Sequence, residues 1–424
     1  MALLGVGLSG LLAAVSAAVL FARLVKDSAR PQLAAVLGAV FAVADVASGR
    51  TTFALGAATA LAALVVLPRL RWAALLAVLT ALLSPVAAAF LGFAAGLLVL
   101  HRRPGGWTLG VAATVPVLVL AVLFPGGGTQ PFSTDSGLAG IGVALVVAAV
   151  TSVPVVRTGA LLYAVAVLAF LNHDDPFGSN VLRLGLLVAA PLVLATARRS
   201  LPVVLVATAV CLWWQSNPTL GDLNDRPRVS YTALNAELQA LGSRRAEVVA
   251  TRDHRESYLV AEKVPLARGW ARQIDLDRNP LFYDGSLSAT TYRAWLLDHA
   301  VDMVAVPRRG VPLDFGSRAE ADLVRTGGVA GLQEVWRDRD WTLYRVDGAR
   351  PIAPAPATVI ASGRTALVLR SAVPAEVPVE VRWSRWLTVD GPGCLQRDGD
   401  RVRVRFHTAG TVRLTSSLTP ARHC

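Results

Sequence analysis

Three consecutive residues, His173-Asp174-Asp175, place two adjacent carboxylates beside an imidazole. Two carboxylates at this spacing could hold a divalent cation that bridges a phosphate group, or one of them could act as a general base. A solvated turn before Pro176 accounts for the same residues without chemistry. We therefore regard Asp174 and Asp175 as candidate catalytic residues and His173 as a candidate substrate-binding residue. A divalent cation is the only cofactor that this pattern suggests, and no metal site is defined by it.

Three further charged residues lie at the edges of long apolar runs. Asp45 precedes Arg50 by five residues, and Arg183 lies three residues inside a later run. Ionisable groups inside a membrane are costly and often mark a polar cavity, where an arginine can bind phosphate. Asp45 is thus a third catalytic candidate, and Arg50 and Arg183 are candidates for binding a lipid phosphate. The alternatives are a local Asp45–Arg50 pair at the membrane interface and snorkelling of Arg183 to the surface.

Another group of candidate residues lies in the polar half of the chain. Arg268, Trp270, Tyr283 and Asp284 occur in a region that is interrupted by glycine and proline, as is typical of loops. An arginine among aromatic side chains could contact a sugar or a lipid headgroup, so Arg268 is a further candidate for substrate binding. The alternative is that this loop simply packs against the neighbouring module.

The three cysteines show no metal-type spacing such as CxxC. Cys211 lies in an apolar run and is expected to be a small buried side chain. Cys394 and Cys424 lie in the polar half, and a disulfide between them can form if that half is outside the cytoplasm. Two unpaired thiols are the alternative.

The distribution of charge divides the chain into two parts. Residues 1–215 contain no glutamate, five aspartates and 12 Lys/Arg, which lie mostly in short clusters between apolar runs. A membrane-spanning helix needs about 20 apolar residues. The sequence therefore predicts a polytopic membrane domain at 1–215, with membrane lipids as partners, followed by a polar region. Basic loops on the cytoplasmic side explain much of the net charge of +12, so no nucleic-acid partner is predicted.

The membrane domain is predicted to contain about ten helical segments, two of which form a short hairpin. The run at 72–100 would be about 43 Å long as a single helix, too long for one untilted span. A break at Ser84-Pro85 turns it into a hairpin and leaves the arginines on both sides in the cytoplasm. The other predicted spans cover about 2–22, 31–47, 52–67, 107–124, 137–156, 158–171, 180–197 and 201–215.

The basic clusters also predict the orientation of the chain in the membrane. With every cluster in the cytoplasm, the N-terminus, the loop at 172–176 and the whole polar half lie outside. A first helix that starts outside at Met1, without a preceding tail or signal, is awkward to insert. This start would be natural if further helices preceded it in a longer protein.

The polar half is predicted to form two modules. Residues 216–348 alternate helical and strand patterns and are interpreted as an extracytoplasmic α/β domain. A segment rich in proline and alanine follows at 347–356. Residues 357–424 alternate apolar and polar positions between turn signals, which predicts a small β-sandwich.

Several segments together resemble a family of proteins. They share no single motif and are spread along most of the chain: Gly49–Gly56, Leu83–Ala87, Asn180–Leu184, Val264–Trp270, Asn279–Tyr283, Val301–Pro307 and Trp341–Val346. The chain resembles a group of uncharacterised actinobacterial multi-pass membrane proteins, whose layout is similar to that of the GT-C glycosyltransferases. That resemblance implies a bacterial plasma-membrane protein of the cell envelope, which handles or transfers sugars from polyprenyl-phosphate carriers at the outer face.

One departure from the GT-C pattern affects the expected activity. GT-C enzymes are expected to carry an acidic residue in the first outside loop, but the only acid before Arg30 is Asp27, which the orientation places in the cytoplasm. A non-catalytic membrane scaffold, or a truncated relative that has lost catalysis, is therefore a second hypothesis. A transporter is a third, although the predicted spans hold few charges and show no evident inverted repeat.

Overall fold

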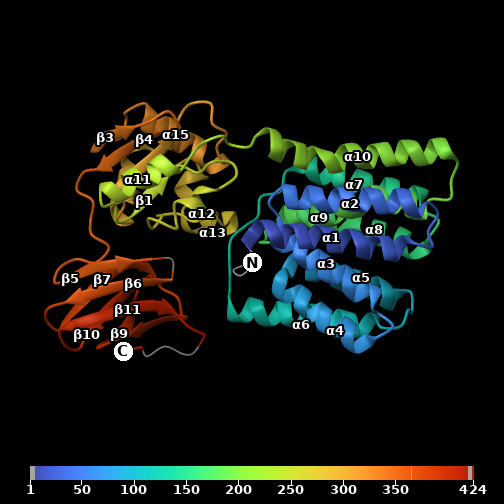
Figure 1. The fold of residues 1–424 in the computed structure, drawn as a ribbon, viewed down its shortest axis with the longest axis horizontal. Coiled ribbons are helices and arrows are strands. Elements are labelled where there is room, and N and C mark those ends of the chain that lie inside the picture. The colour runs from blue at the N-terminus through green and yellow to red at the C-terminus, as the bar shows by residue number, and fades with distance from the viewer. Residues whose placement is uncertain (1–4, 364, 419–422) are drawn as a thin grey trace. The chain divides into compact units, whose positions relative to one another are not determined.

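The computed structural model describes residues 5–363, 365–418 and 423–424. The chain divides into two compact units (Figure 1). The first contains the residues up to Asn224 together with Arg272–Asp277, and the second contains Asp225–Ala271 and Arg278–Cys424. The predicted division into an apolar helical region and a C-terminal region with strands in small sheets is confirmed.

The first unit is built from apolar helices rich in alanine, leucine and valine. They are α1 (Gly5–Val25), α2 (Pro31–Ala47), α3 (Thr51–Val65), α4 (Leu70–Leu83), α5 (Pro85–Leu100), α6 (Gly106–Leu123), α7 (Thr134–Val150), α8 (Pro154–Leu171), the short 3-10 helix η1 (Gly178–Val181), α9 (Leu182–Thr196) and α10 (Leu201–Asn224). Among the described residues, five segments are long and apolar enough to cross a membrane: α1, α6, α8, η1 with α9, and α10. The predicted start of the first span at Ala2 lies outside the described residues.

The break predicted at Ser84-Pro85 is present. Ser84 has an extended backbone, and its hydroxyl accepts a hydrogen bond of 3.3 Å from the backbone N–H of Ala87, while Pro85 occupies the first helical position. Helices α4 and α5 pack against each other on either side of this residue. Gly56 of α3 lies against the break, since a Cβ atom built there would be 2.6 Å from the Cβ of Ser84. The missing side chain of Gly56 thus allows α3 to approach the hairpin closely.

The helix boundaries differ most from the sequence-based expectation at two places. Helix α7 ends at Val150 and α8 begins at Pro154, so Arg157 lies in the first turn of α8 and its guanidinium donates to the carbonyl of Thr151 at 3.0 Å. Helix α10 continues nine residues beyond the predicted end of the last span at Gln215. The polar sequence after Gln215 had suggested a loop, but the chain stays helical to Asn224.

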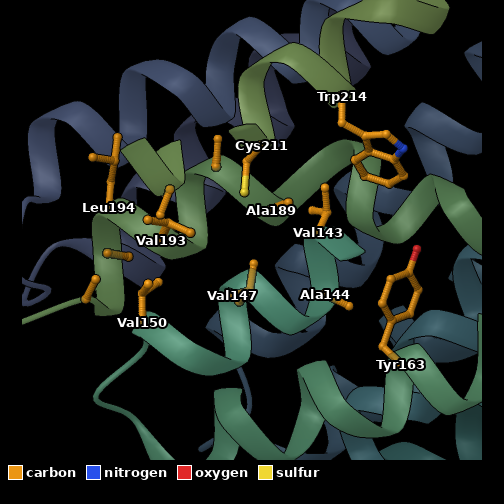
Figure 2. Close-up of a cluster of buried hydrophobic side chains, with 14 of the residues drawn as sticks. Val143, Ala144, Val147, Val150, Tyr163, Ala189, Val193, Leu194, Cys211 and Trp214 are labelled. Carbon is orange, nitrogen blue, oxygen red and sulfur yellow. The ribbon is translucent and has the colours of Figure 1, made fainter. Parts of the chain in front are cut away.

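Figure 2 shows part of the core of the helical unit, where small and medium-sized side chains of α7, α8, α9 and α10 interlock. Tyr163 and Trp214 extend into this core from α8 and α10. Gly185 of α9 lies between them, because a Cβ atom there would be 2.9 Å from the Tyr163 hydroxyl and 3.0 Å from the Trp214 ring. The Tyr163 hydroxyl donates to the carbonyl of Val181 at 3.1 Å, so its polar end is satisfied inside the helical unit.

The second unit begins with a four-stranded mixed sheet of order β1-β2-β4-β3, in which β1 and β2 are parallel. The strands are β1 (Ala246–Val248), β2 (Met303–Pro307), β3 (Leu332–Arg337) and β4 (Trp341–Val346). The helices around them are α11 (Thr232–Ala240), α12 (Glu256–Leu259), η2 (Pro280–Phe282), α14 (Ala289–Asp298), η3 (Phe315–Ser317) and α15 (Arg318–Arg325), while α13 (Arg272–Arg278) belongs mostly to the first unit. Strand β2 is buried along its whole length, as the apolar run at 301–306 predicts.

The C-terminal strands form two small antiparallel sheets, of order β7-β10-β9 and β5-β6-β11-β8. Their strands are β5 (Ala357–Ser362), β6 (Ala366–Ser371), β7 (Ala375–Arg382), β8 (Leu387–Asp390), β9 (Gly393–Asp398), β10 (Arg401–Phe406) and β11 (Gly410–Ser416). Alternate residues of both sheets, such as Leu369, Val404 and Val412, contribute to one hydrophobic core. A disulfide joins Cys394 of β9 to Cys424, and Cys211 is a buried free thiol in α10.

Candidate functional site

Three of the charged residues singled out in the helical unit come together in the structure. Asp45 lies in the last turn of α2, Arg50 directly precedes α3, and Arg183 is the second residue of α9. An Nη1 atom of Arg50 lies 3.8 Å from Oδ1 of Asp45, whose residue is only 9% exposed. Arg183 is near enough to both to interact with them electrostatically. The expected Asp45–Arg50 pair is therefore part of a larger charged cluster.

The side chain of Arg183 is directed toward this cluster. Its guanidinium lies 5.3 Å from the ring centre of Phe53, in the first turn of α3. In the part of the chain that the structure describes, no carboxylate lies within ion-pairing distance of Arg183. An arginine over an aromatic ring, with no carboxylate bound to it, keeps its N–H donors free for another anion.

A fourth charged residue of the cluster, Asp222, was not anticipated. Arg50 reaches its carboxylate from Nη2 at 3.5 Å, and Ser48 donates to the hydroxyl of Thr219 at 3.3 Å. Both partners lie in the extension of α10 beyond Gln215. The polar composition of that extension, with proline and glycine inside it, had assigned Asp222 to the following domain.

The His173-Asp174-Asp175 loop is organised as a turn. The Oδ1 atom of Asp175 accepts hydrogen bonds from the backbone N–H groups of Phe177 at 2.6 Å and Gly178 at 3.0 Å. His173 and Asp174 are exposed. Within the described residues, no group of three or more His, Cys, Asp or Glu side chains is arranged to hold a metal ion. These contacts favour the turn interpretation for Asp175, because one of its carboxylate oxygens accepts from two backbone donors of the turn.

An aromatic row connects this loop with the charged cluster. The ring of Phe177 lies 6.0 Å from that of Phe90 in α5, and Phe90 lies 6.0 Å from Phe53, the ring under Arg183. The two groups of predicted residues are therefore neighbours through aromatic contacts.

An apolar cavity of about 430 Å³ lies among α1, α3, α5, α7, α8 and α9. Phe90 forms part of its wall, and so does Leu184, the residue after Arg183. Tyr163 also lines it but uses its hydroxyl on the backbone of Val181. The cavity can therefore accept hydrocarbon. Its wall residue Phe90 contacts Phe53, which lies under Arg183 of the charged cluster.

Comparisons of the chain with models of protein families, with curated proteins and with solved structures found no match. What the site can do follows from its own geometry. A hydrocarbon chain would be favoured in the cavity, and an anion would be attracted by the arginines at the cluster. The combination suits an amphipathic ligand with a negatively charged head.

Arg268 has a different environment from the one expected for a phosphate-binding residue. Its side chain is 7% exposed, and Nη2 lies 2.6 Å from Oε1 of Glu247 and 2.5 Å from Oε2 of Glu320. The guanidinium carbon lies 3.6 Å from the ring centre of Phe282. These contacts correct the expectation of an accessible arginine, because two buried carboxylates and an aromatic ring already surround it. Packing inside the module is the interpretation that they favour.

The other residues of the predicted loop do not gather around Arg268 as a binding surface. Trp270 is 60% exposed and its ring lies 5.3 Å from that of His254. The ring of Tyr283 packs over Gly316, where a Cβ atom would collide with it. Asp284 is exposed, and hydrogen bonds with Ser286 lower the pKa of its carboxyl below the usual value.

His254 forms a charged cluster in the second unit that sequence reasoning missed. Its Nδ1 lies 3.4 Å from Oε1 of Glu256, and its Nε2 lies 3.2 Å from Oδ1 of Asp314. Burial alone would lower the pKa of His254, but the hydrogen bonds to Asp314 and Glu256 outweigh it and raise the pKa above its ordinary value. A carboxylate faces each ring nitrogen, so the protonated form of this imidazole is favoured. Asp314 is 60 residues away along the chain, and the sequence offers no sign of the contact.

Proposed function

We propose that this chain is an integral protein of a bacterial plasma membrane that binds a lipid-linked anionic substrate of the polyprenyl-phosphate type. The hydrocarbon would occupy the cavity among the helices, and the phosphate would lie at the Arg50–Arg183 cluster. The protein would thus handle, or transfer, lipid-linked sugars in assembly of the cell envelope. The second unit would lie outside the cytoplasm.

The observation that supports this proposal most strongly is the loose pairing of the two arginines. Charge-assisted N–H···O bonds are usually about 2.7–2.9 Å long. Arg50 contacts Asp45 only at 3.8 Å and Asp222 at 3.5 Å. In the described residues, Arg183 has no ion-pair partner and Oδ2 of Asp45 is buried without a hydrogen bond. A phosphate could therefore take short bonds from both guanidinium groups without displacing strong ones.

The chemistry of sugar transfer would fall to the aspartates. Asp45 interacts electrostatically with both arginines and is the better placed candidate for a general base. Asp174 is exposed in the loop that precedes Phe177. It remains a candidate ligand for a divalent cation that also binds the phosphate.

A lipid-binding experiment tests the proposal. The full chain is placed in phosphatidylcholine nanodiscs, and retention of a radiolabelled polyprenyl-phosphate sugar is measured with and without Mg²⁺ or Mn²⁺. We expect Arg50→Gln/Arg183→Gln to weaken binding by about 10-fold or more, since hydrogen bonds to charged groups contribute about 1.5–3 kcal/mol each. Arg103→Gln, an exposed arginine after α5, is the matched control and should bind as the wild type does.

Two further ligands and variants make the result specific. Polyprenol without phosphate should bind weakly to wild type and variant alike, because it lacks the group that the arginines recognise. Loss of a metal-dependent increase in Asp174→Ala/Asp175→Ala would assign the cation to the loop. Absence of binding by the wild type, or equal binding by the arginine variant, would contradict the proposal.

A second candidate function is a non-catalytic membrane protein that holds such a lipid or acts as a scaffold. The observation that favours it is that Oδ1 of Asp175 accepts hydrogen bonds from two backbone N–H groups, which gives one of the two adjacent acids a structural role in the turn. Both candidates predict lipid binding, but only the enzyme predicts release of the sugar. Retention of an intact lipid-linked sugar over long incubation with varied sugar acceptors would favour the non-catalytic protein.

A further inference from the structure

A cleft of about 700 Å³ lies in the second unit, separate from the residues discussed above as binding candidates. Its walls come from α11 and the segment before it, from residues at both ends of α12, and from the turn between β3 and β4. Four arginines line it: Arg226, Arg228, Arg255 and Arg339. With Asp340 as the single carboxylate in the lining, the formal charge around the cleft is +3.

The positive charge of the cleft is not neutralised by the protein. Among the described residues, Arg226, Arg228 and Arg255 form no ion pair, and Arg339 reaches Asp340 only at 3.6 Å. Some other arginines of this unit pair closely, as Arg403 does with a carboxylate at 2.6 Å. Three unpaired arginines around one concave surface are unfavourable to each other, and an anion would relieve that repulsion.

The acid in the cleft is already bound. Oδ2 of Asp340 accepts a hydrogen bond of 2.9 Å from the backbone N–H of Ser230, and its other oxygen lies 3.5 Å from Nε of Arg308. Asp340 is 4% exposed, so its carboxylate faces the protein. It therefore positions the wall of the cleft and does little to repel an incoming anion.

Helix α11 adds to the attraction. It starts at Thr232, which lines the cleft together with Ser230 and Tyr231. The N-cap residue Tyr231 provides no side-chain hydrogen bond, and the Ser230 hydroxyl accepts one from the backbone N–H of Thr232 at 3.4 Å. The exposed N–H groups of a helix N-terminus carry partial positive charge. This contribution is secondary to the four arginines but has the same sign and direction.

We propose that the cleft binds a diphosphate group that carries an organic part of about sugar size. Guanidinium groups recognise phosphate oxygens through paired N–H donors, and a charge of +3 matches a diphosphate better than a single phosphate. The cleft is larger than an inorganic anion requires, and Pro227, Val229 and Leu259 provide apolar wall for the organic part. The ligand could arrive dissolved, as a nucleoside diphosphate sugar, or attached to a lipid, as a polyprenyl diphosphate sugar. The inference is independent of the proposed lipid-phosphate site in the helical unit.

The first experiment uses inorganic pyrophosphate and the full chain in a non-ionic detergent, with isothermal titration calorimetry as the readout. We expect binding with a Kd of about 1 mM or tighter at low salt, weakening as ionic strength rises. Arg228→Gln/Arg255→Gln should weaken it at least about 10-fold. Arg413→Gln, an exposed arginine on β11, should leave it unchanged.

Two controls keep the outcome decisive. The thermal unfolding midpoint of the double variant must match that of the wild type, and otherwise the single substitution Arg228→Glu, at an exposed position, replaces it. Arg50→Gln/Arg183→Gln should retain pyrophosphate binding, which separates this cleft from the site in the helical unit. Equal binding by the cleft variant and the wild type, or no binding by the wild type, would overturn the inference.

The source of the diphosphate is then resolved by competition. A uridine diphosphate sugar and a polyprenyl diphosphate sugar are each titrated against bound pyrophosphate. Tighter binding of the first supports a dissolved ligand, and tighter binding of the second supports a lipid-linked one. If neither organic part improves on pyrophosphate, the proposed fit of the sugar-sized group is wrong.

Discussion

Removal of the Arg268 side chain charge should open the α/β module locally. The guanidinium connects Glu247 in β1 with Glu320 in α15, and Tyr292 in α14 donates to Glu320 at 2.8 Å. Glu247 and Glu320 are 1% and 0% exposed, so Arg268→Met would remove the guanidinium from between two buried carboxylates. Breaking a buried ion pair by removing one partner costs about 3–5 kcal/mol.

The assay must measure opening of the α/β module separately from the rest of the chain. Because the chain has two compact units, its unfolding is not treated as a single transition. Amide hydrogen exchange of β1 and α15 in the intact chain measures their opening directly. A loss of about 3–5 kcal/mol would raise their exchange rates by roughly two to three and a half orders of magnitude. Strand β10, in the C-terminal sheets, serves as an internal reference.

Two further variants distinguish the ion cluster from simple packing. Arg268→Lys keeps the charge but cannot bridge two carboxylates with a planar fork, so its effect should be intermediate. Adding Glu247→Gln and Glu320→Gln to Arg268→Met should recover part of the loss, because these two buried side chains are then neutral. The reasoning is refuted if Arg268→Met changes exchange in β1 by less than about threefold. Loss of lipid binding in that stable variant would instead revive the phosphate-binding role.

Three more predictions concern other parts of the chain. The pKa of His254 is raised in the folded state, so its stabilising contribution is fully present below about pH 6.5 and is lost as the pH rises through the folded pKa. His254→Asn should therefore reduce the loss of thermal stability that accompanies this rise in pH. Cys394→Ser opens a loop of 30 residues and should lower stability by about 3–4 kcal/mol, seen as a denaturation midpoint equal to that of reduced wild type. Gly56→Leu should lower the thermal stability of the helical unit in detergent, because a Cβ there lies 2.6 Å from that of Ser84, whereas Gly96→Leu, with no atom within 4 Å, should not.

Much of the helical unit could be predicted because its signals are local. Apolar runs and basic flanks gave α2 with the same bounds as in the structure, and the Ser84-Pro85 break gave the α4–α5 hairpin. Proline has no N–H and disfavours a continuous helix, so two adjacent residues are enough to predict this break. The extension of α10 was missed because its stability comes from elsewhere, through the contacts of Thr219 and Asp222 with residues of the α2–α3 turn.

The charged sites of the second unit could not be predicted, because they too depend on contacts between residues that are far apart in the sequence. The carboxylates that enclose Arg268 are 21 and 52 residues away in the sequence, and they meet it only when β1 and α15 pack together. The sequence showed an arginine near aromatic residues. This pattern occurs both in sugar-binding sites and in packed cores. Burial decides between the two, and burial depends on the tertiary fold.

The arginines of this chain differ in how many of their N–H donors contact carboxylates, and this difference shows which of them could bind a ligand. A guanidinium has five N–H donors. Arg268 uses its donors on two carboxylates at 2.5–2.8 Å and has little left for a ligand. Arg50 contacts its two aspartates only at 3.5–3.8 Å, and within the described residues Arg183 and Arg228 pair with none. An arginine without a carboxylate partner in a concave site has N–H donors available for an anion, so lipid phosphate at Arg183 and diphosphate at Arg228 are the ligands on which experiments should concentrate.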